Sequence, residues 1–303
     1  MDSAPDFDAL WDFGDPAGTE ARFRAQLAEA RGGAAWRAEL RTQIARTLGL
    51  QGKFDEARAE LDAVSDELAS LAPDEAHRPR ARWLLERGRV ANSSGQAEEA
   101  RPIFVEAFEL AEGAGEETLA IDAAHMVAIV SSPEDALAWT ERALALANAS
   151  ADPVARGWRG PLQNNVGWTF HESGRFDEAL ARFDASRAAF EEAEKPARAR
   201  IARWAMARTL RSLERYEEAL AAQTALEVEL RELGEPDGYV FEEMGENLLA
   251  LERGDEARAW FAKAHATLSG DAWLQRNEPD RLGRLERLAE LGGVTGAESD
   301  EQP

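Results

Sequence analysis

Apolar residues recur along this chain at helical spacing, in pairs of stripes separated by short breaks. In the clearest case Leu162, Val166 and Phe170 recur every four residues, and a second stripe begins at Phe176 after a break at Gly174. Apolar positions three or four residues apart lie on one face of an α-helix. The pattern therefore predicts two helices joined by a tight turn, and such a hairpin needs similar hairpins on either side to bury both of its faces.

The rest of the chain repeats this plan, giving seven predicted units. An alanine marks the start of each predicted second helix, and successive alanines lie about 36 to 43 residues apart. Six of these alanines follow an acidic pair, and acidic residues in the first turn of a helix favour its positive end. The seven predicted anchors are Ala21, Ala57, Ala100, Ala136, Ala179, Ala219 and Ala257.

One unit carries a recognisable motif. Gly167 and Phe170 in the first helix, followed by Ala179 and Phe183 in the second, resemble the tetratricopeptide repeat. The resemblance covers roughly residues 7–270 and implies an all-α fold, a right-handed α-solenoid of antiparallel helix pairs. Because the spacing exceeds the family's period of about 34 residues, HEAT-like helix pairs of about 40 residues are the structural alternative.

The two ends of the array differ from its middle. Residues 6–13 predict a short opening helix, and residues 280–291 predict an amphipathic helix that caps the last repeat, since a terminal repeat needs one solvated face. We therefore expect a single solenoid over residues 1–291. Residues 292–303 are small and acidic, which is typical of a disordered tail. Asp15-Pro16 and Ser132-Pro133 are typical of helix starts inside the array.

Composition narrows the function. The chain has 35 basic and 58 acidic side chains, a net charge of −23, which repels nucleic acid and anionic membranes. It has no cysteine, so thiol catalysis and cysteine-based metal sites are excluded. No apolar run approaches the roughly eighteen residues needed to span a bilayer, and the first residues lack the pattern of a signal peptide. We expect a cytoplasmic protein.

Signatures of catalysis and of cofactor binding are missing from the sequence. There is no phosphate-binding glycine loop, no Gly-x-Ser-x-Gly and no His-Glu-x-x-His. The four histidines lie in separate units, unlike a metal-binding pair, and the adjacent acidic pairs are explained by their recurrence at helix starts. We expect neither an enzyme nor a cofactor or metal site.

The candidate binding residues lie on the predicted first helices, opposite the buried stripe. Resemblance to the family implies that these helices line a concave surface. Arginine binds carboxylates through paired hydrogen bonds, asparagine can hold peptide amides, and tryptophan supplies a rigid apolar wall. The candidate residues are Arg46, Arg89, Asn92, His125, Asn164, Trp168, His171, Trp204, Arg208 and Arg211.

Structural roles compete with this interpretation. Trp168 and Trp204 could be packing residues between neighbouring helices, since large aromatic residues at helical spacing are usually buried. Arg208 and Arg211 could pair with acidic neighbours such as Glu172 or Glu214. Arg87 precedes Gly88 where the best-matching units have an apolar residue, so either the register slips or Arg87 is buried with a carboxylate.

The sequence thus predicts a non-enzymatic interaction scaffold whose groove binds an acidic or C-terminal peptide segment of a partner protein. One alternative is a ligand-responsive regulator that closes around a small peptide or metabolite. Another is a structural subunit that self-associates through its edge repeats. The sequence specifies neither the partner's identity nor the oligomeric state.

Overall fold

The computed structural model describes residues 8–29 and 32–290, and the regular secondary structure of that part of the chain is helical. Its contacts divide the chain into two compact units, residues 1–162 and 163–303, with the boundary inside helix α9. A single body over residues 1–291 stays a prediction. The predicted tail at 292–303 lies outside the described residues.

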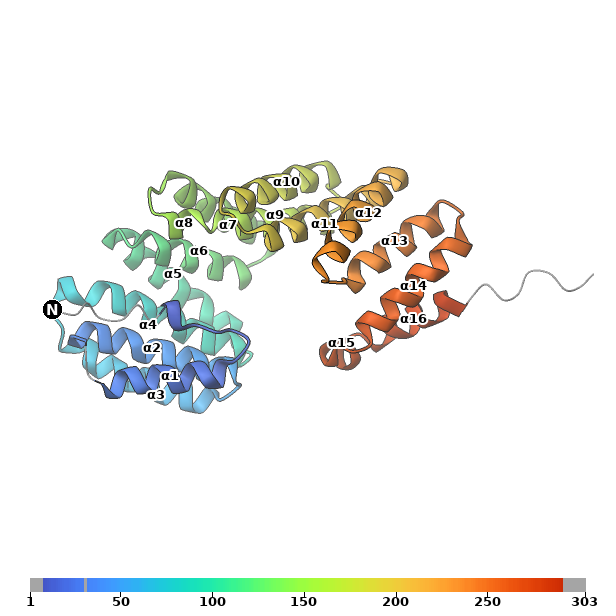
Figure 1. Cartoon of the computed structure of the whole chain (residues 1–303). Coiled ribbons are helices and arrows are strands. Elements are labelled where there is room, and N and C mark those ends of the chain that lie inside the picture. The colour runs from blue at the N-terminus through green and yellow to red at the C-terminus, as the bar shows by residue number, and fades with distance from the viewer. Residues whose placement is uncertain (1–7, 30–31, 291–303) are drawn as a thin grey trace, which may run out of the picture. The chain divides into compact units, whose positions relative to one another are not determined.

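The first described element of unit 1 is a short 3₁₀ helix, where the sequence predicted an opening helix at residues 6–13, and α-helices follow it (Figure 1). Its elements are η1 (Asp8–Leu10), α1 (Pro16–Ala28), α2 (Ala34–Leu50), α3 (Phe54–Ala69), α4 (Pro73–Ser93), α5 (Ala97–Ala114), α6 (Glu117–Ile129), α7 (Pro133–Ala149), α8 (Pro153–Arg156) and the first turn of α9 (Arg159–Glu172).

Unit 2 contains the remainder of α9 and ends with the predicted capping helix. Its further elements are α10 (Phe176–Glu192), α11 (Pro196–Ser212), α12 (Tyr216–Leu233), α13 (Gly238–Ala250), α14 (Gly254–Leu268), α15 (Ala272–Asn277) and α16 (Pro279–Glu290). The cap was predicted at residues 280–291 and is confirmed as α16, which buries Leu282 and Leu285 against α14.

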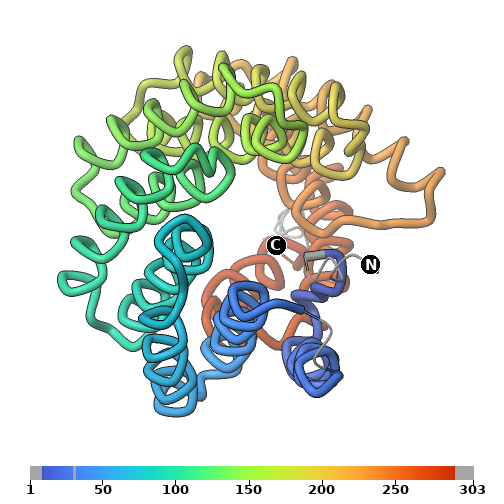
Figure 2. The backbone as a smooth tube through the Cα atoms, turned by 90° about the vertical axis from the view of Figure 1, so that its left-hand side faces the viewer, coloured from blue at the N-terminus to red at the C-terminus, as the bar shows by residue number. Residues whose placement is uncertain are grey.

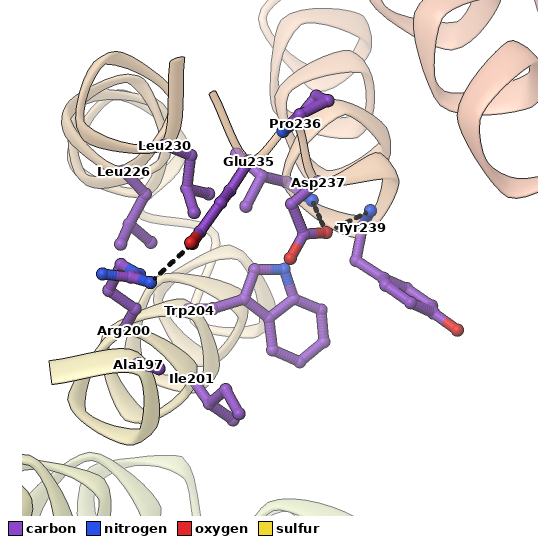
Figure 3. Close-up of a pocket in the computed structure, with 11 residues that line it drawn as sticks. Ala197, Arg200, Ile201, Trp204, Leu226, Leu230, Glu235, Pro236, Asp237 and Tyr239 are labelled. Atoms are coloured by element: carbon purple, nitrogen blue, oxygen red, sulfur yellow. Dashed lines mark hydrogen bonds and ion pairs between the residues drawn. The ribbon is translucent and has the colours of Figure 1, made fainter. Parts of the chain in front are cut away.

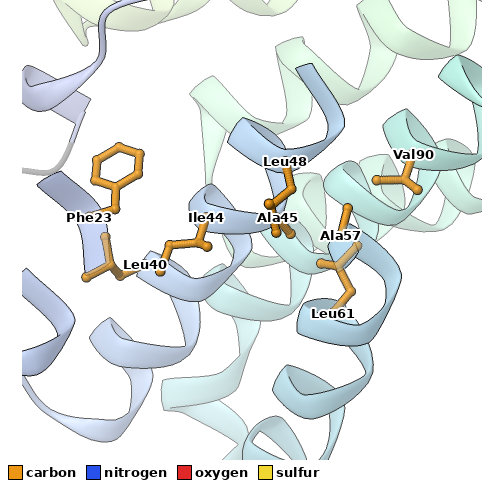
Figure 4. Close-up of a cluster of buried hydrophobic side chains, with 8 residues drawn as sticks. All are labelled: Phe23, Leu40, Ile44, Ala45, Leu48, Ala57, Leu61 and Val90. Atoms are coloured by element: carbon orange, nitrogen blue, oxygen red, sulfur yellow. The ribbon is translucent and has the colours of Figure 1, made fainter. Parts of the chain in front are cut away.

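Helices in each unit form hairpins that stack side by side. In unit 1 the hairpins α2–α3, α4–α5 and α6–α7 pack so that α2, α4 and α6 are neighbours in one layer, as the blue-to-green part of Figure 2 shows. Eight buried residues from α1 to α4, Phe23, Leu40, Ile44, Ala45, Leu48, Ala57, Leu61 and Val90, form a core between these helices (Figure 4). Burial of this apolar surface between hairpins is what holds neighbouring repeats together.

A glycine in the first helix and a phenylalanine in the second bring the helices of a hairpin close together. A Cβ atom built on Gly167 would lie 2.5 Å from the ring of Phe183, so only glycine fits. Gly88 meets Phe104 in the same way, which places α4 in register with the other repeats. Both alternatives predicted for Arg87 are therefore wrong: the register holds, and Arg87 is exposed, with its guanidinium 4.6 Å from the centre of the Trp83 ring.

Most of the predicted alanine anchors lie where small residues are needed. Ala57, Ala100, Ala179, Ala219 and Ala257 are all fully buried at the start of a second helix. Ala136 is only half-buried. Ala21 is exposed, so it does not serve as an anchor. The buried residues of α1 are Thr19 and Phe23, which lie on another face of the helix.

The helix starts follow the predicted chemistry. The side chains of Asp15 and Ser132 accept hydrogen bonds from backbone N–H groups of the first turn, and Pro16 and Pro133 begin α1 and α7. Asp237 caps α13 in the same manner. None of the helices in residues 8–29 and 32–290 is both long and apolar enough to cross a membrane.

Candidate functional site

In unit 1, two candidate arginines lie in a network of ion pairs that joins α2, α4 and α6. Arg89 on α4 donates two hydrogen bonds of 2.6 Å to the carboxylate of Asp122 on α6 and a further one to Glu86. Arg46 on α2 lies 3.9 Å from Glu86, and Glu86 is almost fully buried. We call Arg46, Glu86, Arg89 and Asp122 the unit 1 cluster.

The two positive and two negative charges of the unit 1 cluster are paired with one another. Burial alone would raise the pKa of Asp122, but Arg89 and Arg46 hold that pKa below its usual value. Asp122 and Glu86 in turn raise the pKa of Arg89, so its charge is permanent. Arg46 also stacks 5.3 Å from the ring centres of both Trp11 and Phe13. The cavity beside Arg46 and Arg89 measures only about 210 Å³.

The other two candidates of unit 1 lie beside this cluster. Asn92 is half-buried near the end of α4. His125 on α6 is half-buried with its ring 5.6 Å from that of Trp158, and burial lowers its pKa, so it is neutral near pH 7. Arg89 already has two carboxylate partners, and the sequence-based expectation of an open basic surface therefore fits this unit poorly.

In unit 2, the aromatic candidates form a row across α9, α11 and α13. The ring of Trp168 lies 6.1 Å from that of Trp204, which lies 6.3 Å from that of Tyr239. Trp168 also packs edge-on against Phe183 in the hairpin core and against His171. Both tryptophans are half-buried, so each packs partly between helices and is partly exposed; a binding role for either one stays a prediction.

Beside this row lies a charged trough of about 460 Å³. Four arginines from α11 and α16 surround three glutamates from α13 that lie between them. We call this set the arginine trough: Arg208, Arg211, Arg281, Arg284, Glu242, Glu243 and Glu246, with Trp204 at its edge.

Glu243 links the arginines of α11 to α13. Arg211 donates hydrogen bonds of 2.7 and 3.0 Å to its two carboxylate oxygens, and Arg208 approaches it at 3.0 Å. The partner of Arg208 and Arg211 is thus neither Glu172 nor Glu214. Burial raises the pKa of Glu243, and the two arginines counteract this only in part.

The arginines of α16 approach α13 from the other side. Arg281 binds Glu242 at 2.6 Å and Glu278, just outside the trough, at 3.0 Å, and its guanidinium lies 4.9 Å from the ring centre of Tyr239. Arg284 is bound to Glu246 through one nitrogen only, and 46% of its side chain is exposed. A guanidinium has five N–H donors, so Arg284 keeps donors that point to no protein acceptor among the described residues.

A histidine extends the trough toward α9. The Nε2 atom of His171 lies 3.0 Å from the hydroxyl of Ser212, to which Arg208 also donates a hydrogen bond of 3.0 Å. Burial, helped by the charge of Arg208, lowers the pKa of His171. Asn164, the remaining candidate, is half-buried on α9, and its side-chain oxygen has no hydrogen-bond partner among the described residues.

An apolar pocket of about 590 Å³ opens between α11, α12 and α13 (Figure 3). Leu226, Leu230 and Val240 are its buried residues, and the exposed Ile201 lies at its rim. Trp204 lines both this pocket and the arginine trough. The two cavities therefore meet at one side chain.

Comparison with solved structures identifies the architecture. RapI in its apo form is 12% identical, with a TM-score of 0.72 over 95% of this chain and 81% of that one. A signal transduction ATPase of Pyrococcus horikoshii with a tetratricopeptide repeat sensor is 12% identical, with a TM-score of 0.70 over 88% of this chain; the match spans only 42% of that protein. The apo form of the quorum sensor NprR from B. thuringiensis is 15% identical, with a TM-score of 0.63 over 93% of this chain and 79% of that one.

The fold is tetratricopeptide-like. At this level of identity the similarity concerns the fold alone. No protein-family model matches the sequence, and a comparison with curated proteins finds no similar sequence.

The arrangement of the helix hairpins determines which candidate residues lie close together. All ten lie on first helices, but the structure gathers them into two groups, Arg46, Arg89, Asn92 and His125 in unit 1 and the other six in unit 2. No group of three or more acidic or histidine side chains in the described residues is placed to hold a metal ion.

Of the residues that line the trough, the sequence-based candidates include only Trp204, Arg208 and Arg211. Glu243 is not among the candidates, and Arg281 and Arg284 lie in the segment that the sequence predicts only as a capping helix. A signal was present, because Arg281 and Arg284 repeat the three-residue spacing of Arg208 and Arg211. The same register applied to the capping helix would have found them.

Proposed function

We propose that this chain binds an extended acidic or C-terminal peptide segment of a partner protein in the arginine trough, without catalysing a reaction. The observation that carries the proposal is the arginine excess of the open trough, in which four arginines line a cavity with three glutamates. A ligand carboxylate would meet guanidinium donors already held in position by Glu243 and Glu246. Charge-assisted hydrogen bonds of this kind are the strongest that side chains form.

The exposed donors favour the arginine trough over the unit 1 cluster. Arg89 has a side chain only 15% exposed and is saturated by two carboxylates, whereas Arg284 is 46% exposed and has one. A ligand could bind Arg284 without breaking a buried ion pair, and breaking such a pair is costly.

The aromatic row supports an extended peptide as the ligand. Trp168 and Trp204 lie on neighbouring first helices, so their rings follow the direction in which successive repeats stack. Rigid aromatic surfaces beside charged groups are typical of peptide-binding sites, because they bury apolar area at little entropic cost.

A ligand-responsive regulator is the second candidate. Two of the three similar structures are described as sensors, one with a tetratricopeptide repeat sensor and one a quorum sensor. Their likeness to this chain concerns the fold, so the sensing role is a proposal. It predicts that a ligand which raises the melting temperature of the chain also changes its radius of gyration in small-angle X-ray scattering, whereas a scaffold would bind without such a change.

Selection from a random heptapeptide library displayed with free C termini tests the first proposal. We expect enriched sequences to carry acidic residues, and the synthetic peptides to lose affinity when the C terminus is amidated or the acidic residues are replaced by glutamine. Enrichment of neutral or basic sequences, or of no sequence, would contradict the proposal.

Two substitutions on α16 locate the binding. Arg284→Gln removes one charge from the arginine trough, and Arg287→Gln removes one charge from an exposed position outside it. We expect Arg284→Gln to weaken peptide binding about fivefold, equivalent to roughly 1 kcal/mol, and Arg287→Gln to have little effect. Equal losses would mean that only the net charge of the chain matters.

A further inference from the structure

We propose that the apolar pocket and the arginine trough form one bipartite site, so that the ligand is a peptide with a large apolar side chain next to its carboxylates. This inference rests on the proposed function of the trough. It adds a second recognition element, which selects among acidic peptides.

The pocket has the dimensions and lining of a ligand site. Its volume of about 590 Å³ lies within the range of roughly 300–1,000 Å³ that is typical of small-molecule sites. Leu226 and Val240 are almost fully buried at its walls, while Ile201 is 51% exposed at the rim. A large aliphatic or aromatic side chain can therefore enter from solvent and contact apolar atoms on several sides.

The charged groups at this pocket are already paired. Arg200 is bound to Glu235 at 2.9 Å, as the dashed line in Figure 3 shows. One carboxylate oxygen of Asp237 accepts hydrogen bonds from the backbone N–H groups of Tyr239 and Val240. The Arg200–Glu235 ion pair and the hydrogen-bonded carboxylate of Asp237 thus have partners already, and the apolar walls suit an uncharged side chain.

Trp204 provides a buried polar group at this pocket that lacks a hydrogen-bond partner among the described residues. Its indole nitrogen is buried, and no acceptor among the described residues is in hydrogen-bonding geometry, although Figure 3 shows the ring beneath Asp237. A buried N–H group without an acceptor is uncommon and unfavourable. Because Asp237 covers this nitrogen, a carbonyl group from a bound peptide satisfies it only when the Asp237 side chain moves aside.

The position of Trp204 joins the two cavities into one site. Its ring lines the apolar pocket, and it also borders the trough that contains Arg208 and Arg211. Arg208 lies one helical turn after Trp204 on α11, so the carboxylate subsite and the apolar subsite are separated by about one turn, roughly 5 to 6 Å. Two residues of an extended peptide cover such a distance, at up to about 3.6 Å each.

Three synthetic probes measured by calorimetry separate the subsites. The full probe is an acetylated peptide of glycine, phenylalanine and two glutamates with a free C terminus. In the acidic probe glycine replaces the phenylalanine. In the apolar probe glutamines replace the glutamates and the C terminus is amidated. We expect the full probe to bind at least tenfold more tightly than either of the others.

Variants of the pocket then test the apolar subsite. Ile201→Asn makes the rim polar at an exposed position, and we expect it to weaken the full probe about fivefold while leaving the acidic probe unchanged. Leu233→Asn is the control, since Leu233 is 53% exposed nearby but does not line the pocket. Trp204→Phe keeps an aromatic ring but removes the N–H donor, and should weaken the full probe several-fold without a large drop in melting temperature.

The outcomes distinguish this inference from the proposed function. If the acidic and full probes bind equally, or Ile201→Asn affects no probe, the bipartite site is wrong while the trough proposal stands. If the apolar probe binds as tightly as the full probe, the pocket acts independently of the trough and the inference is also overturned. If neither the full nor the acidic probe binds, the proposed function itself fails.

Discussion

The unit 1 cluster and the arginine trough use the same residue types on equivalent first helices, but they differ in how completely the charges are enclosed. Arg89 meets Asp122 and Glu86 inside the structure, with side-chain exposures of 15%, 14% and 2%. In the trough Arg208, Arg211, Arg281 and Arg284 are between 23% and 46% exposed and border a cavity of about 460 Å³. The first arrangement joins helices to each other, and the second leaves donors available to a ligand.

This difference shows that an arginine stripe is not by itself a binding site. Exposed ion pairs contribute little to stability because water competes with them, whereas a buried pair is strongly destabilising once one partner is removed. The same substitution should therefore have different consequences in the two units: in unit 1 it should affect folding, and in unit 2 it should affect binding.

The largest expected effect is on stability. Arg89→Met leaves Asp122 and Glu86 buried without their main cation and should lower the free energy of unfolding by about 3–5 kcal/mol. Arg284→Met removes an exposed partner of Glu246 and should cost at most about 1 kcal/mol. Urea denaturation of both variants measures the difference, and similar losses would contradict the distinction between the units.

The two buried carboxylates should respond to pH in opposite directions. The pKa of Asp122 is lowered by Arg89 and Arg46, so its stabilising contribution is present above its usual pKa of 3.8 and is lost as the pH falls through the lowered value. The pKa of Glu243 is raised by burial above 4.5, so its contribution is present below pH 4.5 and is lost as the pH rises through the raised value.

The test is to measure the free energy of unfolding of wild type, Asp122→Asn and Glu243→Gln between about pH 3 and about pH 7. The stability advantage of wild type over Asp122→Asn should shrink as the pH falls, while that over Glu243→Gln should grow. Parallel pH profiles for the two variants would show that the carboxylates lie in similar environments.

Removal of an acidic residue from the trough should strengthen binding. Glu246→Gln increases the excess of positive charge, and we expect acidic peptides to bind about fivefold more tightly, equivalent to roughly 1 kcal/mol. Glu286→Gln makes the same change in net charge at an exposed position of α16 outside the trough. An unchanged affinity in Glu246→Gln would show that ligands do not contact this part of unit 2.

The smallest expected effect is the pH dependence of peptide binding, which we test at the two half-buried histidines. Burial and Arg208 lower the pKa of His171, with Glu172 opposing and Arg211 adding to the shift. A bound carboxylate favours the protonated ring, so affinity should rise about threefold as the pH falls through this pKa. His171→Gln should abolish the pH dependence, and His125→Gln in unit 1 should not. A dependence that survives in His171→Gln would assign it to another group.

The hairpins could be predicted from sequence because their determinants are local. The spacing of Leu162, Val166 and Phe170 and the pairing of Gly167 with Phe183 lie within one repeat and follow from helix geometry. The same reasoning failed at the first unit, where a three-residue 3₁₀ helix precedes α1 and Phe23 rather than Ala21 is buried.

The ion pairs could not be predicted because they depend on how neighbouring first helices slide against each other. Arg89 and Asp122 are 33 residues apart in sequence, and Arg211 and Glu243 are 32 apart. A shift of one residue between adjacent helices would change which carboxylate meets which arginine. Periodicity within a helix specifies the face of each side chain but not its partner across the interface.

Arginine side-chain NMR tests the central claim most directly. Chain labelled with ¹⁵N-arginine would be titrated with the full probe and with its amidated, glutamine-containing analogue, following the Nε–Hε signals assigned by substitution. We predict that the full probe shifts the signals of Arg208 and Arg284 and leaves those of Arg46 and Arg89 in place, whereas the analogue shifts none of them. Shifts at Arg46 and Arg89 with no change in unit 2 would contradict the account.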